Sequence, residues 1–101
     1  MNDFDQLIQD IEAEAQAEGP AAVAQLRAFE VQFTLAADLI ALRKARGLSQ
    51  KQLASASGVQ QADISRIERG LVNPTIGTVE KLARPLRAQV RMLPRDVRAA
   101  A

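Results

Sequence analysis

Apolar residues recur every three or four positions through most of this 101-residue chain, which is the spacing of one face of an α-helix. The first such stretch covers residues 3–17, where an apolar stripe alternates with acidic residues. Glycine and proline follow at Gly19 and Pro20, which predicts the end of this helix and the start of another. The large residues of the stripe are Phe4, Leu7, Ile8 and Ile11.

A second helical stretch runs from residue 21 to about residue 46 and is rich in Ala and Leu. It is either one long helix or two. The β-branched and aromatic run at residues 31–34 is its weakest helical segment, so we expect any bend there. The candidate buried positions are Val23, Leu26, Phe29, Phe33, Ile40 and Leu42.

Two short helices are predicted next. Ser49 and Gln52 have the spacing of a capping box, which predicts a helix over about residues 50–56. Gly58 allows a tight turn with positive φ, and a further helix is expected from about residue 60 to residue 69. The side chains expected to face inward are Leu53, Ala54, Val59, Ile64 and Ile67.

The last part of the chain predicts one more helix and a strand. Pro74 favours a first helical turn, and the apolar spacing after it predicts an amphipathic helix that Pro85 ends. Residues 88–93 alternate between apolar and polar, which indicates a short strand ending at Pro94. Because a single strand leaves its backbone groups unpaired, a second copy of the chain is the simplest supplier of a partner.

The composition excludes most familiar enzyme chemistry. The chain contains no Cys, His, Trp or Tyr, which removes disulfides, thiolate or imidazole metal ligands, and every Ser-His or Cys-His nucleophile. We therefore expect no enzyme activity, no metal and no cofactor. The N-terminus is acidic, and no run reaches the roughly 18 apolar residues of a membrane span, so we expect a cytoplasmic protein with no membrane contact.

The formal net charge of +1 hides a strong asymmetry. Residues 1–30 carry seven acidic residues and one basic residue, whereas residues 31–101 carry twelve basic and five acidic ones. A basic surface attracts polyanions, and an acidic surface attracts basic partners. The two parts are therefore expected to bind different partners, unless they only attract each other.

Two short helices joined by a glycine turn in a basic region are typical of a helix-turn-helix. The stretch LSQKQLASASGVQQADISRIERG, followed by NPTIGTVEKLA, resembles the Xre and Cro-repressor family of helix-turn-helix DNA-binding domains. The resemblance covers residues 34–86. It implies an all-α, lambda-repressor-like helix-turn-helix bundle, to which this chain adds an N-terminal amphipathic helical extension and a short C-terminal β-strand.

The resemblance also implies roles for individual residues. In the major groove, Gln can pair with adenine, Arg with guanine, and an Ala methyl can contact thymine. The implied base-reading residues are Gln61, Ala62 and Arg66. The implied contacts with the DNA backbone are Gln50, Gln60, Ser65, Asn73 and Thr75.

Three charged residues have other expected roles. Arg43 and Glu68 match a pair that, in the family, forms an ion pair between the first helix and the recognition helix, so we expect a structural pair. Asp63 stands where the family commonly has a small hydroxyl residue. A carboxylate near phosphates weakens binding, so Asp63 either accepts from a cytosine amine or faces away from the DNA.

The whole layout, from FTLAADLIALRKARGLSQKQLA to PTIGTVEKLARPLRAQVRML, also resembles HigA-type antitoxins. Such proteins repress their own operon and bind a small basic toxin, an mRNA-cleaving endonuclease of the RelE or HigB kind. An acidic amphipathic segment suits a basic partner, so the stripe formed by Phe4, Leu7, Ile8 and Ile11 is a candidate toxin-binding surface. Packing of the stripe on its own domain or on a second copy stays open, as does a solitary Xre-family repressor without a toxin.

These expectations divide the chain into three parts. Residues 1–30 are an acidic helical extension for toxin binding or dimerisation, residues 31–87 are the DNA-binding domain, and residues 88–101 are a short strand and a frayed tail. We expect a homodimer on a palindromic double-stranded DNA operator, with half-sites about 34 Å apart. The protein would lie in the cytoplasm and associate with the nucleoid when bound to its operator.

Overall fold

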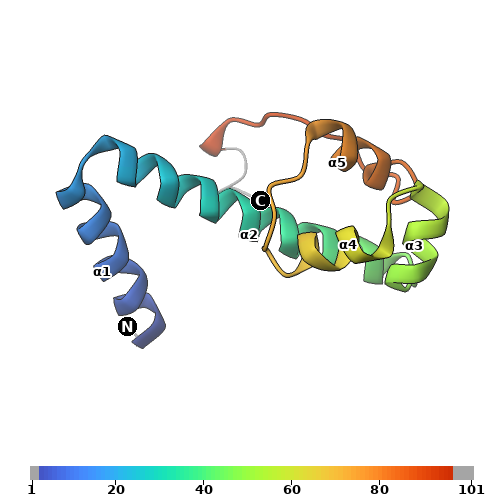
Figure 1. Cartoon of the computed structure of the whole chain (residues 1–101), viewed down its shortest axis with the longest axis horizontal. Helices are drawn as coiled ribbons and strands as arrows, with labels where there is room; N and C mark the ends of the chain where they lie inside the picture. Colours follow the sequence, from blue (N-terminus) through green and yellow to red (C-terminus); the bar gives the residue numbers. More distant parts are fainter. Residues whose placement is uncertain (1–2, 97–101) are drawn as a thin grey trace.

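The computed structural model describes residues 3–96, and this part of the chain contains five α-helices. Figure 1 shows α1 turning back from the start of α2 and diverging from it at an angle, while α3, α4 and α5 gather around the second half of α2. The predicted all-α helix-turn-helix class is confirmed. The helices are α1 (Asp3–Glu18), α2 (Pro20–Ala45), α3 (Gln50–Ser57), α4 (Gln61–Glu68) and α5 (Ile76–Ala83).

Within the described residues, α1 packs on the first half of α2. Pro20 is the first residue of α2, where its missing N–H costs nothing, and Gly19 makes the corner between the helices. Ala15 is buried in the contact, and Glu12 forms an exposed 3.7 Å ion pair with Arg27. The four large residues of the α1 stripe stay between 39% and 66% exposed. Packing against α2 therefore leaves most of the stripe uncovered.

The α2 helix is continuous over 26 residues, so the bend considered at residues 31–34 is absent. The hydroxyl of Thr34 donates to the carbonyl of Glu30 one turn earlier, which gives this β-branched residue a partner inside the helix. The buried face of α2 also differs from the expected one. Phe29, Phe33 and Leu42 are exposed, because Ala36 and Leu39 instead face the other helices.

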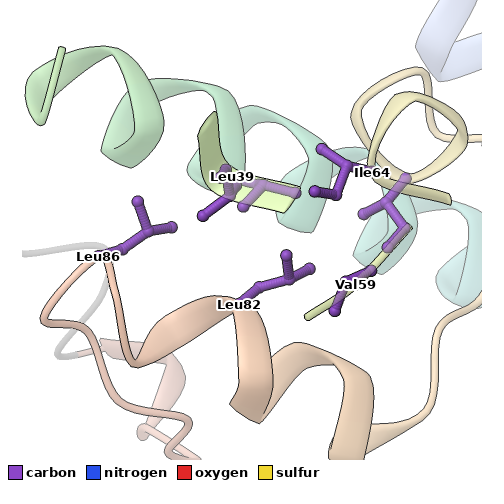
Figure 2. Packing of buried hydrophobic residues seen from close by; sticks show 7 residues of the cluster. Leu39, Val59, Ile64, Leu82 and Leu86 are labelled. Atoms are coloured by element: carbon purple, nitrogen blue, oxygen red, sulfur yellow. The ribbon is translucent and has the colours of Figure 1, made fainter. Parts of the chain in front are cut away.

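The hydrophobic core joins α2, α3, α4 and α5, and Figure 2 shows its side chains meeting between these helices. It contains no residue of α1. The inward positions predicted for the two short helices are confirmed, with Ala54 packed at the margin of the cluster. The buried cluster consists of Leu39, Leu53, Val59, Ile64, Ile67, Leu82 and Leu86.

The turn between α3 and α4 has the predicted geometry. Ser49 Oγ accepts from the backbone N–H of Gln52, and the Gln52 side chain accepts from the backbone N–H of Ser49, which completes the capping box of α3. Gly58 ends α3 with φ of 78°, a conformation that other residues adopt only with strain. The short connection places α4 directly across α3.

The C-terminal part departs from the sequence prediction in two places. Thr75 caps α5, so Pro74 lies in the preceding loop and not in the first helical turn. The predicted strand at residues 88–93 is wrong: this segment is irregular, and no strand forms anywhere in residues 3–96. Its alternating pattern lacks a neighbouring strand within one copy of the chain.

The helix-ending prediction at Pro85 is confirmed, since α5 stops at Ala83. The carbonyl of Leu86 then accepts from Arg46 Nε at 3.3 Å, which ties this turn to the end of α2. Residues 97–101 of the predicted frayed tail lie outside the described part. Within the described part, no helix is both long and apolar enough to cross a membrane.

Candidate functional site

The α4 helix presents a polar face to solvent and an apolar face to the core. Ile64, Ile67 and Glu68 are buried, which fixes the rotation of the helix about its axis. The residues predicted to read bases, Gln61, Ala62 and Arg66, are all exposed on the other side. Ala62 and Arg66 are four positions apart and so lie one turn above each other, with Gln61 beside them at the start of the helix.

Arg66 does not extend freely from this surface. Its Nη1 donates to Asp63 Oδ1 at 2.7 Å, and the two side chains are 50% and 49% exposed. Asp63 therefore faces Arg66. The sequence left two roles for Asp63, accepting from a cytosine amine or facing away from the DNA. Asp63 lies on the polar surface of α4 and so does not turn away from it, but its carboxylate already accepts from Arg66.

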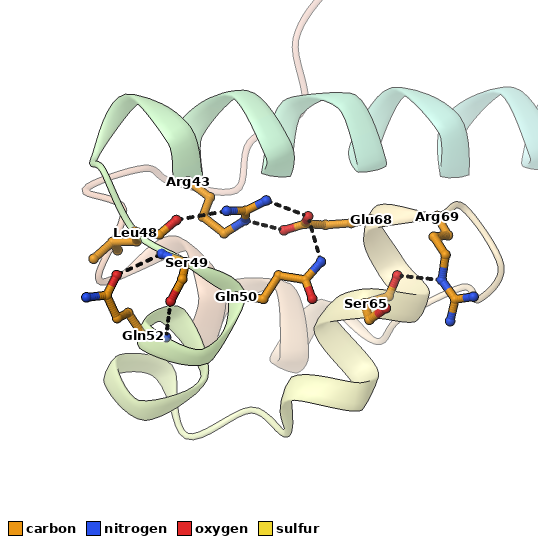
Figure 3. Close-up of polar contacts among 8 residues, drawn as sticks. All are labelled: Arg43, Leu48, Ser49, Gln50, Gln52, Ser65, Glu68 and Arg69. Atoms are coloured by element: carbon orange, nitrogen blue, oxygen red, sulfur yellow. Dashed lines mark hydrogen bonds and ion pairs between the residues drawn. The ribbon is translucent and has the colours of Figure 1, made fainter.

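A buried polar network holds α4 against α2 and α3. Arg43 Nε and Nη2 donate to the two carboxylate oxygens of Glu68 at 2.7 and 3.0 Å, and Arg43 Nη1 donates to the carbonyl of Leu48 at 2.8 Å (Figure 3). Gln50 Nε2 also donates to Glu68, at 3.1 Å. The chain thus forms the ion pair expected between Arg43 and Glu68, and Gln50 belongs to the same network.

The network sets the ionisation of Glu68. Burial by itself raises the pKa of a carboxyl group, but the hydrogen bonds from Arg43 and Gln50 and the charges of Arg43 and Lys44 outweigh it. The pKa of Glu68 is therefore lowered from its ordinary value of 4.5. The carboxylate stays charged at neutral pH and keeps both partners in place.

The remaining residues expected at the DNA backbone lie on α4 or just before α4 and α5. Gln60 precedes the first turn of α4 and is exposed, whereas Ser65 is partly covered. Asn73 and Thr75 precede α5, and Thr75 Oγ1 accepts from the backbone N–H of Thr78 at 3.2 Å. The five backbone candidates thus come from the starts of three helices and from one face of α4.

Two contacts of the site were not predicted from the sequence. The bond between Gln50 and Glu68 joins positions 18 residues apart, so only the crossing of α3 and α4 creates it. The pair formed by Asp63 and Arg66 is different, because oppositely charged residues three apart on a helix are neighbours. That spacing could have identified the pair in advance.

The second candidate surface is the apolar stripe of α1, which lies on the same side of the helix as buried Ala15. The stripe stays exposed, on a helix that carries acidic residues throughout and no basic residue. Phe4 is the most exposed member of the stripe, at 66%. An uncovered apolar stripe edged by negative charge is a surface suited to a partner with the opposite charge.

Comparisons with known proteins find similarity that includes the middle of the chain and extends beyond it. The family model described as Helix-turn-helix matches residues 39–91. A protein of Haemophilus influenzae named an uncharacterized HTH-type transcriptional regulator is 40% identical over 74 residues, which cover 73% of this chain and 76% of that protein. The region that the family model matches includes α3, α4 and α5, and so the exposed polar face of α4.

Two further similarities are informative. Antitoxin HigA1 of Mycobacterium tuberculosis is 37% identical over 81 residues, which cover 80% of this chain and 54% of that protein. The crystal structure of an HTH_3 family transcriptional regulator from Vibrio cholerae is similar with a TM-score of 0.59 and 40% sequence identity, over 61% of this chain and 35% of that one. The chain thus spans about half or less of these two relatives.

Proposed function

We propose that this chain, which belongs to the helix-turn-helix family of DNA-binding transcriptional regulators, of the Xre type, is the antitoxin of a type II toxin-antitoxin pair. In this proposal it represses its own operon and neutralises a small basic toxin of the RelE or HigB kind, an mRNA-cleaving endonuclease. The alternative is a solitary repressor, since several of its relatives are named only as transcriptional regulators.

The DNA-binding part of the proposal rests on α4. Gln61, Ala62 and Arg66 would enter the major groove and read base edges, as the chemistry of amide, methyl and guanidinium groups allows. The backbone candidates would fix the register of the helix: Gln50, Gln60, Ser65, Asn73 and Thr75. Gln50 can do so while bonded to Glu68, because its amide keeps a second N–H and its oxygen for other partners.

We expect the operator to be palindromic and the protein to bind it as a homodimer. Val90, Met92 and Leu93 are exposed on the irregular C-terminal segment, and Val90 and Leu93 line an apolar cavity of about 440 Å³ between α2 and α5. A second copy that covers these side chains would bury them in a dimer interface. Size-exclusion chromatography with light scattering measures the mass directly.

One observation carries the antitoxin proposal: α1 leaves a large apolar stripe exposed and contributes no side chain to the buried cluster of the other four helices. An apolar stripe of this size suits burial against another protein. Residues 1–18 carry six acidic residues and no basic residue, which suits a basic ribonuclease. The similarity to an antitoxin over 80% of this chain supports the same interpretation.

The test is co-purification. This chain is expressed with the product of the adjacent reading frame, only one of the two is tagged, and the eluate is analysed for both. We expect a stoichiometric complex that protects cells from the toxin, and we expect Phe4→Asp with Leu7→Asp to abolish both the complex and the protection.

The matched control places the same charges on the opposite side of α1, as Gln9→Asp with Ala13→Asp, and should keep the complex. DNA binding should survive in both variants. A chain that elutes alone as a dimer and still shifts its own promoter DNA would contradict the antitoxin proposal and leave the solitary repressor.

A further inference from the structure

The ion pair between Asp63 and Arg66 lies on the face of α4 that is proposed to enter the groove. A carboxylate there faces DNA phosphates of the same sign, which lowers affinity. An acidic residue in the first turn of a helix is favoured by the helix dipole. The dipole explains a negative charge near the start of α4, and the three-residue spacing brings this charge to 2.7 Å from the arginine proposed to read bases.

We propose that Asp63 is a positioning residue that makes Arg66 specific for guanine. The inference rests on the proposed DNA binding by α4. An arginine side chain with several rotatable bonds loses freedom when it binds, and a partner that holds it beforehand reduces this loss. Asp63 lies three residues before Arg66 on the same helix, so the pair can form with or without DNA.

The geometry of the pair is compatible with guanine recognition. A guanidinium carries five N–H donors, and Asp63 uses one of them, on Nη1. The second N–H of Nη1 and the N–H groups of Nη2 remain for the two guanine acceptors, O6 and N7. Among the contacts in residues 3–96, the side chain of Arg66 donates to no other protein group.

The pair also changes how Arg66 interacts with non-specific DNA. A free arginine binds any phosphate and releases a counterion, whereas a paired arginine and carboxylate have no net charge to offer. Asp63 therefore weakens binding to random sequence and leaves a directional contact with one base. Specificity, the ratio of operator to random binding, rises even though total affinity does not.

The experiment uses the full chain and double-stranded sites that the wild-type protein selects from a randomised DNA library. Base substitutions across the selected site first identify the base pair at which Arg66→Ala loses discrimination. Asp63→Asn, which keeps the shape and removes the charge, is then measured on the same sites. We expect a drop of about tenfold in guanine discrimination at that base pair, with tighter binding to random DNA.

Glu80→Gln is the matched control. Glu80 forms an exposed ion pair with Arg84 at the end of α5, at 2.7 Å, so the change removes the same charge and breaks the same kind of pair. It should leave base discrimination unchanged. Asp63→Asn should also have no effect on discrimination in the Arg66→Ala background, because Asp63 acts through Arg66. Circular dichroism checks that every variant is folded.

Four outcomes would overturn the inference. Asp63→Asn could leave guanine discrimination intact, or it could lose discrimination at a base pair that Arg66→Ala does not affect, which would make Asp63 itself a reader of cytosine. A uniform loss in Arg66→Ala, or a wild-type chain that selects no site, would remove the proposed base reading as well. The last result appears in the wild type, so failure of the proposed function is distinguishable from failure of this inference.

Discussion

Glu68 is the residue on which three helices converge, since α2 provides Arg43, α3 provides Gln50 and α4 provides Glu68 itself. The pair with Arg43 could be predicted only from the family resemblance, because 25 positions separate the two residues. The contact with Gln50 depends on how α3 crosses α4, which no local spacing encodes. Gln61, Ala62 and Arg66 could be predicted as facing outward, because the apolar pattern of α4 fixes which side faces the core.

The lowered pKa of Glu68 gives a pH prediction at this scale. A carboxyl group whose pKa is lower in the folded state stabilises the fold above its ordinary pKa of 4.5, and this contribution is lost as the pH falls through the folded-state pKa. Glu68→Gln should therefore be less stable than the wild type at neutral pH by about 2 kcal/mol, the size of a hydrogen bond to a charged group. Urea unfolding at several pH values measures the difference.

The difference in free energy of unfolding between the wild type and Glu68→Gln should shrink as the pH falls below 4.5, because protonated Glu68 resembles Gln. A control variant is Glu80→Gln, whose ion pair with Arg84 is exposed and should contribute at most about 1 kcal/mol. A difference for Glu68→Gln that stayed constant down to acidic pH would mean that charge plays no part in the network.

At the scale of elements, local signals predicted local structure. The capping box of α3 and the glycine turn before α4 each depend on a few consecutive residues, so both were recognisable in the sequence. The buried face of α2 was not, because an Ala- and Leu-rich helix offers several apolar stripes and its neighbours decide which one is covered. The prediction of a strand at residues 88–93 was wrong for the same reason. Alternation of apolar and polar residues is a local pattern, but a strand also needs a neighbouring strand.

The packing of α2 against the end of α4 gives a prediction at this scale. Gly70 has φ of 69°, and a Cβ there would lie 2.8 Å from Cδ1 of Phe33. Gly70→Ala should therefore cost more than the roughly 1 to 2 kcal/mol of a left-handed alanine, because the ring of Phe33 must also move. The melting temperature and urea midpoint measure the loss.

Gly47→Ala is the control for Gly70→Ala, since Gly47 has φ of 67° and a Cβ added there would meet no other atom within 4 Å. Its free energy of unfolding should fall only by the cost of the left-handed backbone. Adding Phe33→Ala to Gly70→Ala should recover part of the extra loss. Equal losses of stability in the two single variants would show that the ring of Phe33 moves aside without an energetic cost.

At the scale of the whole molecule, charge and burial divide the chain at the same place. Residues 1–18 carry all of the negative net charge of the first thirty residues, because Arg27 and Glu30 cancel, and these two form an ion pair at 3.0 Å. The α1 helix within this segment contributes nothing to the buried cluster of the other four helices. The composition predicted this division of charge, but only the fold places the acidic helix outside that cluster.

Deletion of residues 1–18 should therefore leave a folded DNA-binding unit with a net charge of +7 in place of +1, since six acidic residues and no basic residue are removed. We expect the shortened chain to bind random DNA more tightly than the full chain at low salt, with the advantage disappearing as salt rises. Fluorescence anisotropy over a salt series measures both constants, and thermal unfolding reports whether the core is intact. A shortened chain that failed to fold would mean that α1 is required by the core after all.

Because α2 is one continuous helix, its length sets the orientation of α1 relative to the helices at its other end. With no loop between the end that carries α1 and the end that carries Arg43, each residue added within the helix would turn α1 by about 100° and move it by about 1.5 Å. About seven added residues make nearly two full turns and restore its direction. Related chains that keep both surfaces should therefore have α2 helices of equal length, or helices that differ by about seven or about eleven residues, since both numbers are close to whole turns.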